Sequence, residues 1–220
     1  MGEYNAFDIL GPIMVGPSSS HTAGACRIAQ MARMITAEGF NEVEFELHGS
    51  FAKTYKGHGT DKALLAGVMN IGPDDDRLRH SFEIADERNL TYSFVASDLG
   101  DVHPNTAKIN FKYPDGSTYS VTGSSIGGGN VVIIDINGIN VQFMGKKPTL
   151  ILKYIDTIGI IGYTATILAE KGYNIESVYT VNDNNLVTLI IELNKNIGND
   201  IDDLIIHNDK YQFAKFIRVD

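Results

Sequence analysis

The chain has 220 residues and a formal net charge of −9, and it contains no block of Lys and Arg that would suit nucleic acid or an anionic membrane. Its content of 43% hydrophobic and 20% charged residues is typical of a folded globular protein and excludes a disordered chain. No apolar run reaches the length of a membrane span and the N-terminus lacks a signal-peptide pattern, so we expect a cytoplasmic protein.

The single cysteine, Cys26, limits the metal chemistry that we expect of this chain. One thiol cannot form an intrachain disulfide, a structural zinc site of several cysteines or a typical iron–sulfur cluster site. Cys26 falls in a predicted helix at a position that suits the core, which favours a buried and unreactive thiol. We therefore predict no metal ligand among these residues.

The first distinctive stretch is GPSSSHTAGA at residues 16–25. Pro17 keeps the backbone out of helical conformation, and Ser20 is a favourable N-cap for a helix that we expect to end at Gly39. The helix is predicted from apolar residues at helical spacing, which are Ala25, Ile28, Ala29, Ala32 and Ile35.

Polar side chains crowd the predicted start of this helix. They are Ser18, Ser19, Ser20, His21 and Thr22. The first backbone N–H groups of a helix lack partners within it and attract anions, so a small carboxylate ligand would suit this end. The alternative is a surface helix with more capping groups than it needs. We favour a binding site, because the small residues 23–25 let another surface approach closely.

A second polar cluster consists of HGSFAKT at residues 48–54 and GHGTD at residues 57–61. Thr60 or Asp61 is predicted to cap the helix that follows. The glycines on either side of His58 remove steric bulk, which makes this histidine a candidate for proton transfer rather than a purely structural residue. The glycine spacing matches no nucleotide-binding fingerprint.

A third polar loop, residues 97–106, follows a strand predicted at residues 91–96 and also contains a histidine, His103. Two interpretations stay open for this loop. It is either a turn shaped by Pro104 and Asn105 or a further wall of the same site.

The rest of the pattern up to residue 145 predicts a mixed α/β domain, residues 1–145. We interpret the glycine run 127–129 as a flexible connector rather than a phosphate-binding nest, and GKKP at residues 145–148 as a domain boundary. A short helix is predicted at residues 81–89. The predicted strands are residues 43–47, 91–96, 107–113, 118–123, 130–136 and 139–143.

The C-terminal part, residues 148–220, shows a compact and regular pattern. Its predicted order is strand, helix, strand, strand, helix, strand, which is the ferredoxin-like arrangement and makes the whole chain α+β. The elements are strands at residues 149–154, 173–181, 186–193 and 212–219 and helices ending at residue 171 and spanning residues 198–207.

The motifs together resemble a known family. DILGP at residues 8–12, running into residues 16–25, resembles the β chain of iron–sulfur-dependent L-serine dehydratases, and so do residues 48–54 with 57–61 and HPNT at residues 103–106. The C-terminal part is similar to an ACT domain. That likeness rests on DTIG at residues 156–159 and GYNI at residues 172–175.

The resemblance implies a reaction and a division of labour between two chains. The family converts L-serine to pyruvate and ammonia without pyridoxal phosphate, using a [4Fe–4S] cluster as Lewis acid. In the family the cluster cysteines lie on the α chain, which agrees with the single Cys26 here. We therefore expect this chain to act with a cluster-bearing α chain and to bring polar loops to the shared site.

Roles for particular residues follow from the same resemblance. We expect His58 to transfer the proton, and His21 to be either a second acid or base or a hydrogen-bonding wall. The residues expected to bind the substrate or line the interface are Ser18, Ser19, Ser20, Thr22, Thr60, Asp61 and Asn105.

The ACT resemblance implies an effector site and self-association through the C-terminal domain. We expect an amino-acid effector to bind near Asp156, Gly159 and Asn174, with L-serine as the first candidate. The N-terminal domain is also similar to the extra serine-regulated domain of some phosphoglycerate dehydrogenases. An alternative function is therefore a non-catalytic, serine-sensing regulatory subunit, and a third is a pure assembly module.

Overall fold

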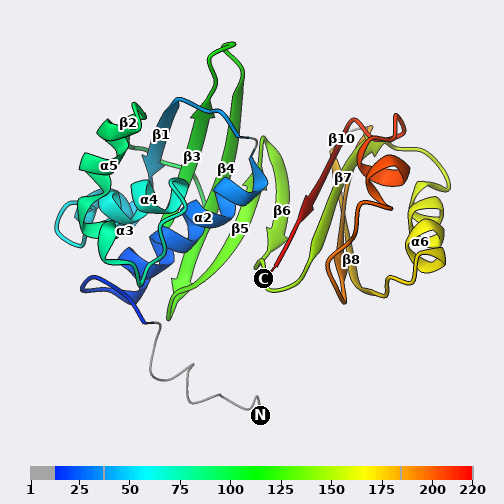
Figure 1. The fold of residues 1–220 in the computed structure, drawn as a ribbon, viewed down its shortest axis with the longest axis horizontal. Helices are drawn as coiled ribbons and strands as arrows, with labels where there is room; N and C mark the ends of the chain where they lie inside the picture. Colours follow the sequence, from blue (N-terminus) through cyan, green and yellow to red (C-terminus); the bar gives the residue numbers. More distant parts are fainter. Residues whose placement is uncertain (1–12, 37, 184, 220) are drawn as a thin grey trace. The chain divides into compact units, whose positions relative to one another are not determined.

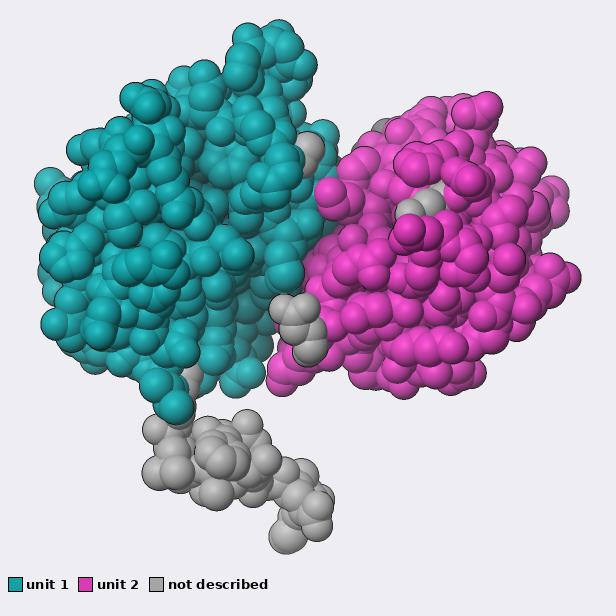
Figure 2. Space-filling view, viewed as in Figure 1, with its two compact units in different colours: residues 1–138 teal, residues 139–220 magenta. Residues whose placement is uncertain are grey.

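A computed structural model describes residues 13–219 except 37 and 184. The chain divides into two compact units, Met1–Gly138 and Ile139–Asp220 (Figure 2). The division falls in the turn of a predicted hairpin, whereas the sequence pattern placed a boundary at residues 145–148. The DILGP motif at residues 8–12 lies outside the described residues.

Both helices and strands occur, which confirms the α+β class (Figure 1). The helical elements of the first unit are η1 Ser19–Gly24, α2 Ala25–Ile35, α3 Gly49–Thr54, α4 Thr60–Val68, η2 Asp76–His80 and α5 Ser81–Glu87. Its strands are β1 Glu42–Leu47, β2 Thr91–Ala96, β3 Thr106–Lys112, β4 Thr118–Gly127 and β5 Asn130–Ile136, and β6 Ile139–Phe143 begins directly after the division between the units.

These six strands form one sheet in the order β2-β1-β3-β4-β5-β6. β1 runs parallel to β2 and antiparallel to β3, and Leu47 pairs with Ala96 on one side and Ala107 on the other. The end of β1, the end of β2 and the start of β3 therefore meet at one edge of the sheet. This register brings together the loops that follow residues 47 and 96 and the loop that precedes residue 106.

Helix α2 covers the sheet and packs against α4 (Figure 1). β1 alternates between half-buried and buried residues, as its charged and apolar residues predicted. The core between the helices and the sheet contains large and fully buried side chains. Among them are Ile28, Ile35, Phe45, Leu64, Ile109, Phe111 and Ile133.

The first helix differs from the prediction at both ends. Ser18, not Ser20, is the N-cap, because its backbone is extended and its Oγ accepts the N–H of His21 at 3.1 Å. The residues that follow form a π-helical turn, in which the N–H of Ala23 reaches the carbonyl of Ser18 at 3.3 Å. The helix ends at Ile35 rather than Gly39, since Thr36 is extended and its hydroxyl pairs with Tyr113.

Two further predictions are corrected in detail. Neither Thr60 nor Asp61 caps α4; Gly59 takes that place in the left-handed conformation, φ 68°. The glycine run 127–129 ends β4 and turns into β5, so it closes a hairpin. All three glycines of that turn have positive φ.

After β6, the second unit has the predicted order of elements. They are β7 Thr149–Ile155, α6 Ile160–Glu170, β8 Ile175–Asp183, β9 Leu186–Leu193, η3 Asp202–Ile206 and β10 Phe213–Ile217. The four strands form a sheet in the order β10-β7-β9-β8 with antiparallel pairs.

The last predicted helix, residues 198–207, is reduced to the short π-helical turn η3. The chain before it is instead held to the end of the unit, because the side-chain amide of Asn196 pairs with the backbone of Val219. Among the described residues, no helix is long and apolar enough to cross a membrane.

Candidate functional site

The second and third polar loops meet at the sheet edge through backbone and imidazole hydrogen bonds. The N–H of Ser50 donates to the carbonyl of Pro104 at 2.8 Å, and the N–H of Leu99 donates to Nδ1 of His48 at 3.1 Å. Gly49 has a positive φ, and a Cβ there would lie 2.7 Å from the carbonyl oxygen of Pro104. A glycine is therefore required at this close approach.

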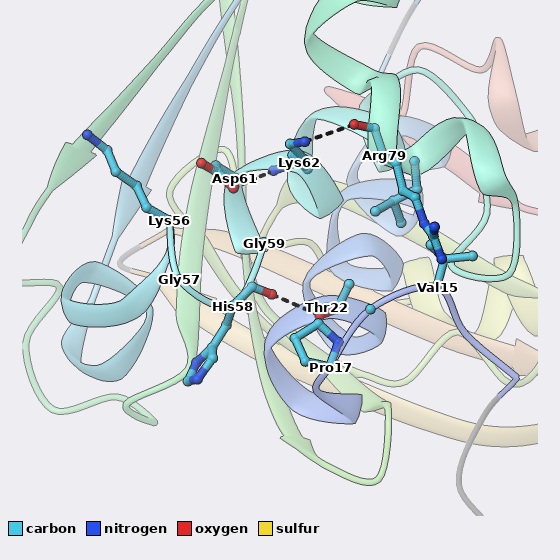
Figure 3. A pocket seen from close by; sticks show the side chains of 12 residues that line it. Val15, Pro17, Thr22, Lys56, Gly57, His58, Gly59, Asp61, Lys62 and Arg79 are labelled. Atoms are coloured by element: carbon cyan, nitrogen blue, oxygen red, sulfur yellow. Dashed lines mark hydrogen bonds between the residues drawn. The ribbon is translucent and has the colours of Figure 1, made fainter.

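The first loop joins the second through a hydroxyl and an imidazole. Thr22 Oγ1 donates to the carbonyl of His58 at 3.0 Å (Figure 3). His21 Nε2 lies 2.9 Å from Ser50 Oγ, and the rings of His21 and His58 meet edge to face with centroids 4.9 Å apart. The fold thus brings together the two histidines that the sequence pattern singled out.

The two imidazoles have different surroundings. Burial, and after it the neighbouring His58, lower the pKa of His21, so its ring is uncharged at neutral pH. His58 is exposed, so its ring is open to an approaching substrate or protein. A neutral imidazole beside an open one suits a site where a single histidine exchanges a proton.

The hydroxyls of the first loop are arranged around His21. Ser18, Ser19 and Ser20 are half-buried, and Ser18 Oγ accepts a hydrogen bond from the backbone N–H of His21. Below the loop, the fully buried Ser125 of β4 approaches Gly24 so closely that a Cβ on Gly24 would lie 2.1 Å from Ser125 Oγ.

A pocket of about 630 Å³ opens beside the turn at residues 57–59, on the side away from the ring of His58 (Figure 3). Figure 3 shows the ring of His58 pointing away from Val15 and Arg79, which line the pocket. The pocket residues are Val15, Gly16, Pro17, Thr22, Lys56, Gly57, His58, Gly59, Asp61, Lys62, Leu78 and Arg79. The cavity and the imidazole pair therefore flank the same turn.

The charges of the pocket are mixed. Lys56, Lys62 and Arg79 contribute positive charge, and Asp61 is a buried carboxyl whose pKa is raised by that burial. Asp61 Oδ1 accepts the N–H of Lys62 at 2.8 Å. Thr60 is fully buried and does not line the pocket, and its hydroxyl has no hydrogen-bond partner among the described residues.

The third loop shows features of both interpretations that were left open. The exposed His103 accepts the N–H of Asn105 on its Nδ1 at 3.1 Å, which is a local turn. The carbonyl of Asn105 accepts the N–H of Ser125 at 2.9 Å, and Pro104 contacts Ser50. The loop is therefore a local turn that also borders the histidine pair.

Ser50 and the three pocket cations were not picked out as site residues from the sequence. Ser50 lies in the HGSFAKT motif, and its place directly after a strand end was the one available signal. Its contact with His21 joins residues 29 positions apart, which no local pattern reveals.

Comparisons with known proteins decide the family. A family model described as serine dehydratase beta chain matches residues 5–89. The L-serine dehydratase, beta chain, of Peptoniphilus asaccharolyticus is 48% identical over the full length of both chains. The chain belongs to the L-serine dehydratase beta chain family. The predicted family resemblance is thereby confirmed.

Two other relatives extend the comparison. This beta chain family member is 37% identical to a probable L-serine dehydratase, beta chain, of Bacillus subtilis (strain 168), over 90% of each chain. It is 26% identical to a D-3-phosphoglycerate dehydrogenase of the same organism, over 70% of this chain and 29% of that protein. The matched family region contains both histidines of the pair, His21 and His58.

Cys26 of this beta chain lies in the helical core. Its thiol is fully buried and donates to the carbonyl of Ile71 at 3.2 Å, and burial raises its pKa to about 12. A cluster ligand must be a thiolate, so this residue does not fit an iron–sulfur cluster. Among the described residues, no group of three or more His, Cys, Asp or Glu side chains is placed to hold a metal ion.

A thiol-labelling experiment tests this description of Cys26. The folded beta chain is expected to react with an aromatic disulfide reagent far more slowly than the same chain in denaturant, because the thiol is neutral and buried. The Cys26→Ala variant should lower the free energy of unfolding by roughly 1–3 kcal/mol. Rapid labelling of one thiol per folded chain would contradict a buried Cys26.

The residues predicted to bind an effector lie in the second unit at opposite ends of α6. Asp156 and Gly159 precede the helix, whereas Asn174 follows it, and all three are exposed. The 11 residues of α6 separate them by roughly 16 Å at 1.5 Å per residue. One copy of the unit therefore does not bring these residues together.

Proposed function

We propose that this chain is the β subunit of a two-chain L-serine dehydratase, which converts L-serine to pyruvate and ammonia with an α subunit. The observation that carries the proposal is the 48% identity to an L-serine dehydratase, beta chain, over the full length of both chains. The His21–His58 pair supports it, because the reaction needs a base for the proton on the α-carbon. Loss of that proton and of the hydroxyl gives aminoacrylate and water, and tautomerisation and hydrolysis then release pyruvate and ammonia.

His58 is the residue that we assign to proton removal. Imidazole is the side chain that most often serves as a general base. His58 is exposed on a turn whose neighbours are glycines, and its carbonyl is fixed by Thr22 at 3.0 Å. His21 forms the wall against which this ring rests.

The substrate carboxylate is assigned to the hydroxyl-rich start of the first helix. Ser18, Ser19 and Ser20 are partly accessible there and stand beside His21. The cations Lys56, Lys62 and Arg79 on the other side of the turn draw anions toward the same region.

The remaining predicted site residues are assigned to supporting the loops. They are Thr22, Asp61 and Asn105, while the burial of Thr60 favours a packing role for that residue.

The [4Fe–4S] cluster implied by the family is proposed to reside on the α subunit. The donor set of this chain does not fit it, since the one thiol is buried, neutral and bonded to a carbonyl. We therefore assign to this chain the binding of the carboxylate and the handling of the proton, and to the partner the remaining chemistry.

Reconstitution with the partner tests the proposal. The purified chain alone is expected to form no pyruvate from L-serine, whereas anaerobic co-expression with its α subunit should give activity and a coloured complex. Activity of the isolated chain after rigorous removal of any partner would contradict the division of labour. An active complex in which this chain can be omitted would contradict its catalytic role.

A second candidate function is amino-acid sensing without chemistry. The observation in its favour is the 26% identity of a D-3-phosphoglycerate dehydrogenase over 70% of this chain. Under this function the complex would retain full maximal activity when His58 is replaced and would lose only its response to added amino acid. The two candidates are therefore separated by the same reconstituted complex.

We further propose that the second unit is an ACT domain whose effector binds between two copies. The support is the separation of Asp156 and Gly159 from Asn174 by the whole of α6, which one copy does not bridge. Titration calorimetry on the full chain is expected to show L-serine binding that the Asn174→Ala variant weakens, with a dimer in sedimentation. Binding to a monomer, or no heat with any small amino acid, would contradict the shared site.

A further inference from the structure

The ring of His21 is held between two serine hydroxyls. Its Nε2 lies 2.9 Å from Ser50 Oγ and its Nδ1 lies 3.4 Å from Ser18 Oγ. Ser18 Oγ already accepts the backbone N–H of His21 at 3.1 Å. The rings of Phe51 and His58 also meet it in T-shaped pairs, with centroids 5.4 and 4.9 Å away.

Counting donors and acceptors favours one arrangement of the protons. A neutral imidazole carries one N–H, so one of its nitrogens must accept. Among the described residues, His21 Nε2 is the one hydrogen-bond partner of Ser50 Oγ. If Nε2 donated, the proton of the Ser50 hydroxyl would have no acceptor there. If Ser50 donates to Nε2, the Nδ1–H faces Ser18 Oγ and each of these donors has a partner.

We propose that Ser50 is a positioning residue that holds His21 neutral, with its proton on Nδ1, and so leaves His58 as the imidazole that takes the substrate proton. This inference rests on the proposed function and specifies how the pair divides its work. The Nε2 lone pair of His21 is occupied, so His21 accepts a second proton only by giving up the bond from Ser50. Two charged rings 4.9 Å apart would also repel each other.

Ser50 is itself fixed from three sides, as a positioning residue must be. Its N–H donates to the carbonyl of Pro104 at 2.8 Å, and its own carbonyl accepts Thr54 Oγ1 at 2.8 Å. The next residue, Phe51, is fully buried and meets the ring of His21 edge to face. Pro104 of the third loop therefore fixes the position of Ser50, and Ser50 in turn fixes the ring of His21.

Nuclear magnetic resonance of the full chain labelled with ¹⁵N in histidine tests the proposal without the partner subunit. Two-bond ¹H–¹⁵N spectra distinguish the Nδ1–H and Nε2–H forms of each ring. The parent chain is expected to show His21 in the Nδ1–H form and uncharged at neutral pH. The Ser50→Ala variant should shift His21 toward the Nε2–H form, and Ser50→Thr should restore the parent pattern.

A matched variant separates positioning from helix stability. Thr54→Val removes the other side-chain hydrogen bond at Ser50 but leaves the hydroxyl at His21 in place, so the spectrum of His21 should not change. If Ser50→Ala unfolds the chain, Ser50→Cys keeps the volume with a weaker donor and should show the same tautomer shift. An unchanged His21 spectrum in a folded Ser50 variant would overturn the proposal, as would an Nε2–H form in the parent.

The reconstituted enzyme gives a second measurement that a merely structural role would not reproduce. Ser50→Ala is expected to lower kcat by roughly tenfold, the effect of one lost hydrogen bond, with little change in KM. A rise in KM alone would overturn the positioning role. The failures remain distinguishable, since absence of serine turnover by the parent complex counts against the proposed function while the spectra still decide the tautomer of His21.

Discussion

Replacing His58 by asparagine in the complex with the α subunit is expected to lower kcat by roughly a hundredfold or more, the usual range for an acid–base group. Asparagine keeps polarity but cannot take up the α-proton near neutral pH. Because His58 is exposed and its backbone carbonyl makes the bond to Thr22, folding and assembly should be preserved. Steady-state kinetics with L-serine and circular dichroism check both parts of the expectation.

Two companion variants control for this result. His103→Asn replaces an exposed histidine that makes a local turn, and we expect a much smaller effect on kcat. His21→Asn should raise KM at least as much as it lowers kcat, because His21 belongs to the wall beside the hydroxyls. If the His58 variant keeps near-normal turnover and still exchanges the substrate α-proton with solvent, the base lies on another residue.

The largest effect on stability is expected from Gly67→Ala. Gly67 is buried in α4 where it crosses α2, and a Cβ there would lie 2.4 Å from the carbonyl oxygen of Cys26 and 2.5 Å from Cβ of Ala29. Backbone atoms of α2 cannot turn aside as a flexible side chain would, so the helices must separate. We expect the free energy of unfolding of the first unit to fall by roughly 1–3 kcal/mol or more.

The same substitution in an open helix provides the control. Gly162 lies in α6, is exposed, and an added Cβ would meet nothing within 4 Å. Gly162→Ala should therefore stabilise its helix by about 0.5–1 kcal/mol through the better helix propensity of alanine. Urea unfolding followed by circular dichroism measures both variants. Equal effects at the two positions would show that helix packing at Gly67 is looser than the structure indicates.

Much of the fold followed from local pattern. The sequence pattern placed β1 and β2 within a residue of their observed bounds, and it separated β5 from β6 at residues 137–138. Local pattern could not decide which of several equally suitable neighbouring residues takes a given structural position. Three serines in a row all suit an N-cap, and the choice of Ser18 depends on the π-helical turn that follows it.

The candidate site was predictable as a set of loops but not as a geometry. His21 and His58 were singled out by residue type and by flanking small residues, and the fold places their rings together. Ser50 was missed because its role depends on a contact between separate loops, which in turn depends on the sheet register. The cap at Gly59 was missed because Thr60 and Asp61 are common capping residues, while a left-handed glycine gives no such signal.

The parallel pairing of β1 with β2 has a consequence for the order of folding. Glu42 pairs with Thr91, so this contact closes a long stretch of chain, whereas β3, β4 and β5 are joined by short turns. Closing a long loop costs more chain entropy and is slower than forming a hairpin. We therefore expect the hairpins to gain protection from hydrogen exchange first and the β1–β2 edge last. In a newly made chain, the loop that follows β1 would therefore reach its final position late. The contact between His21 and His58 would form only then.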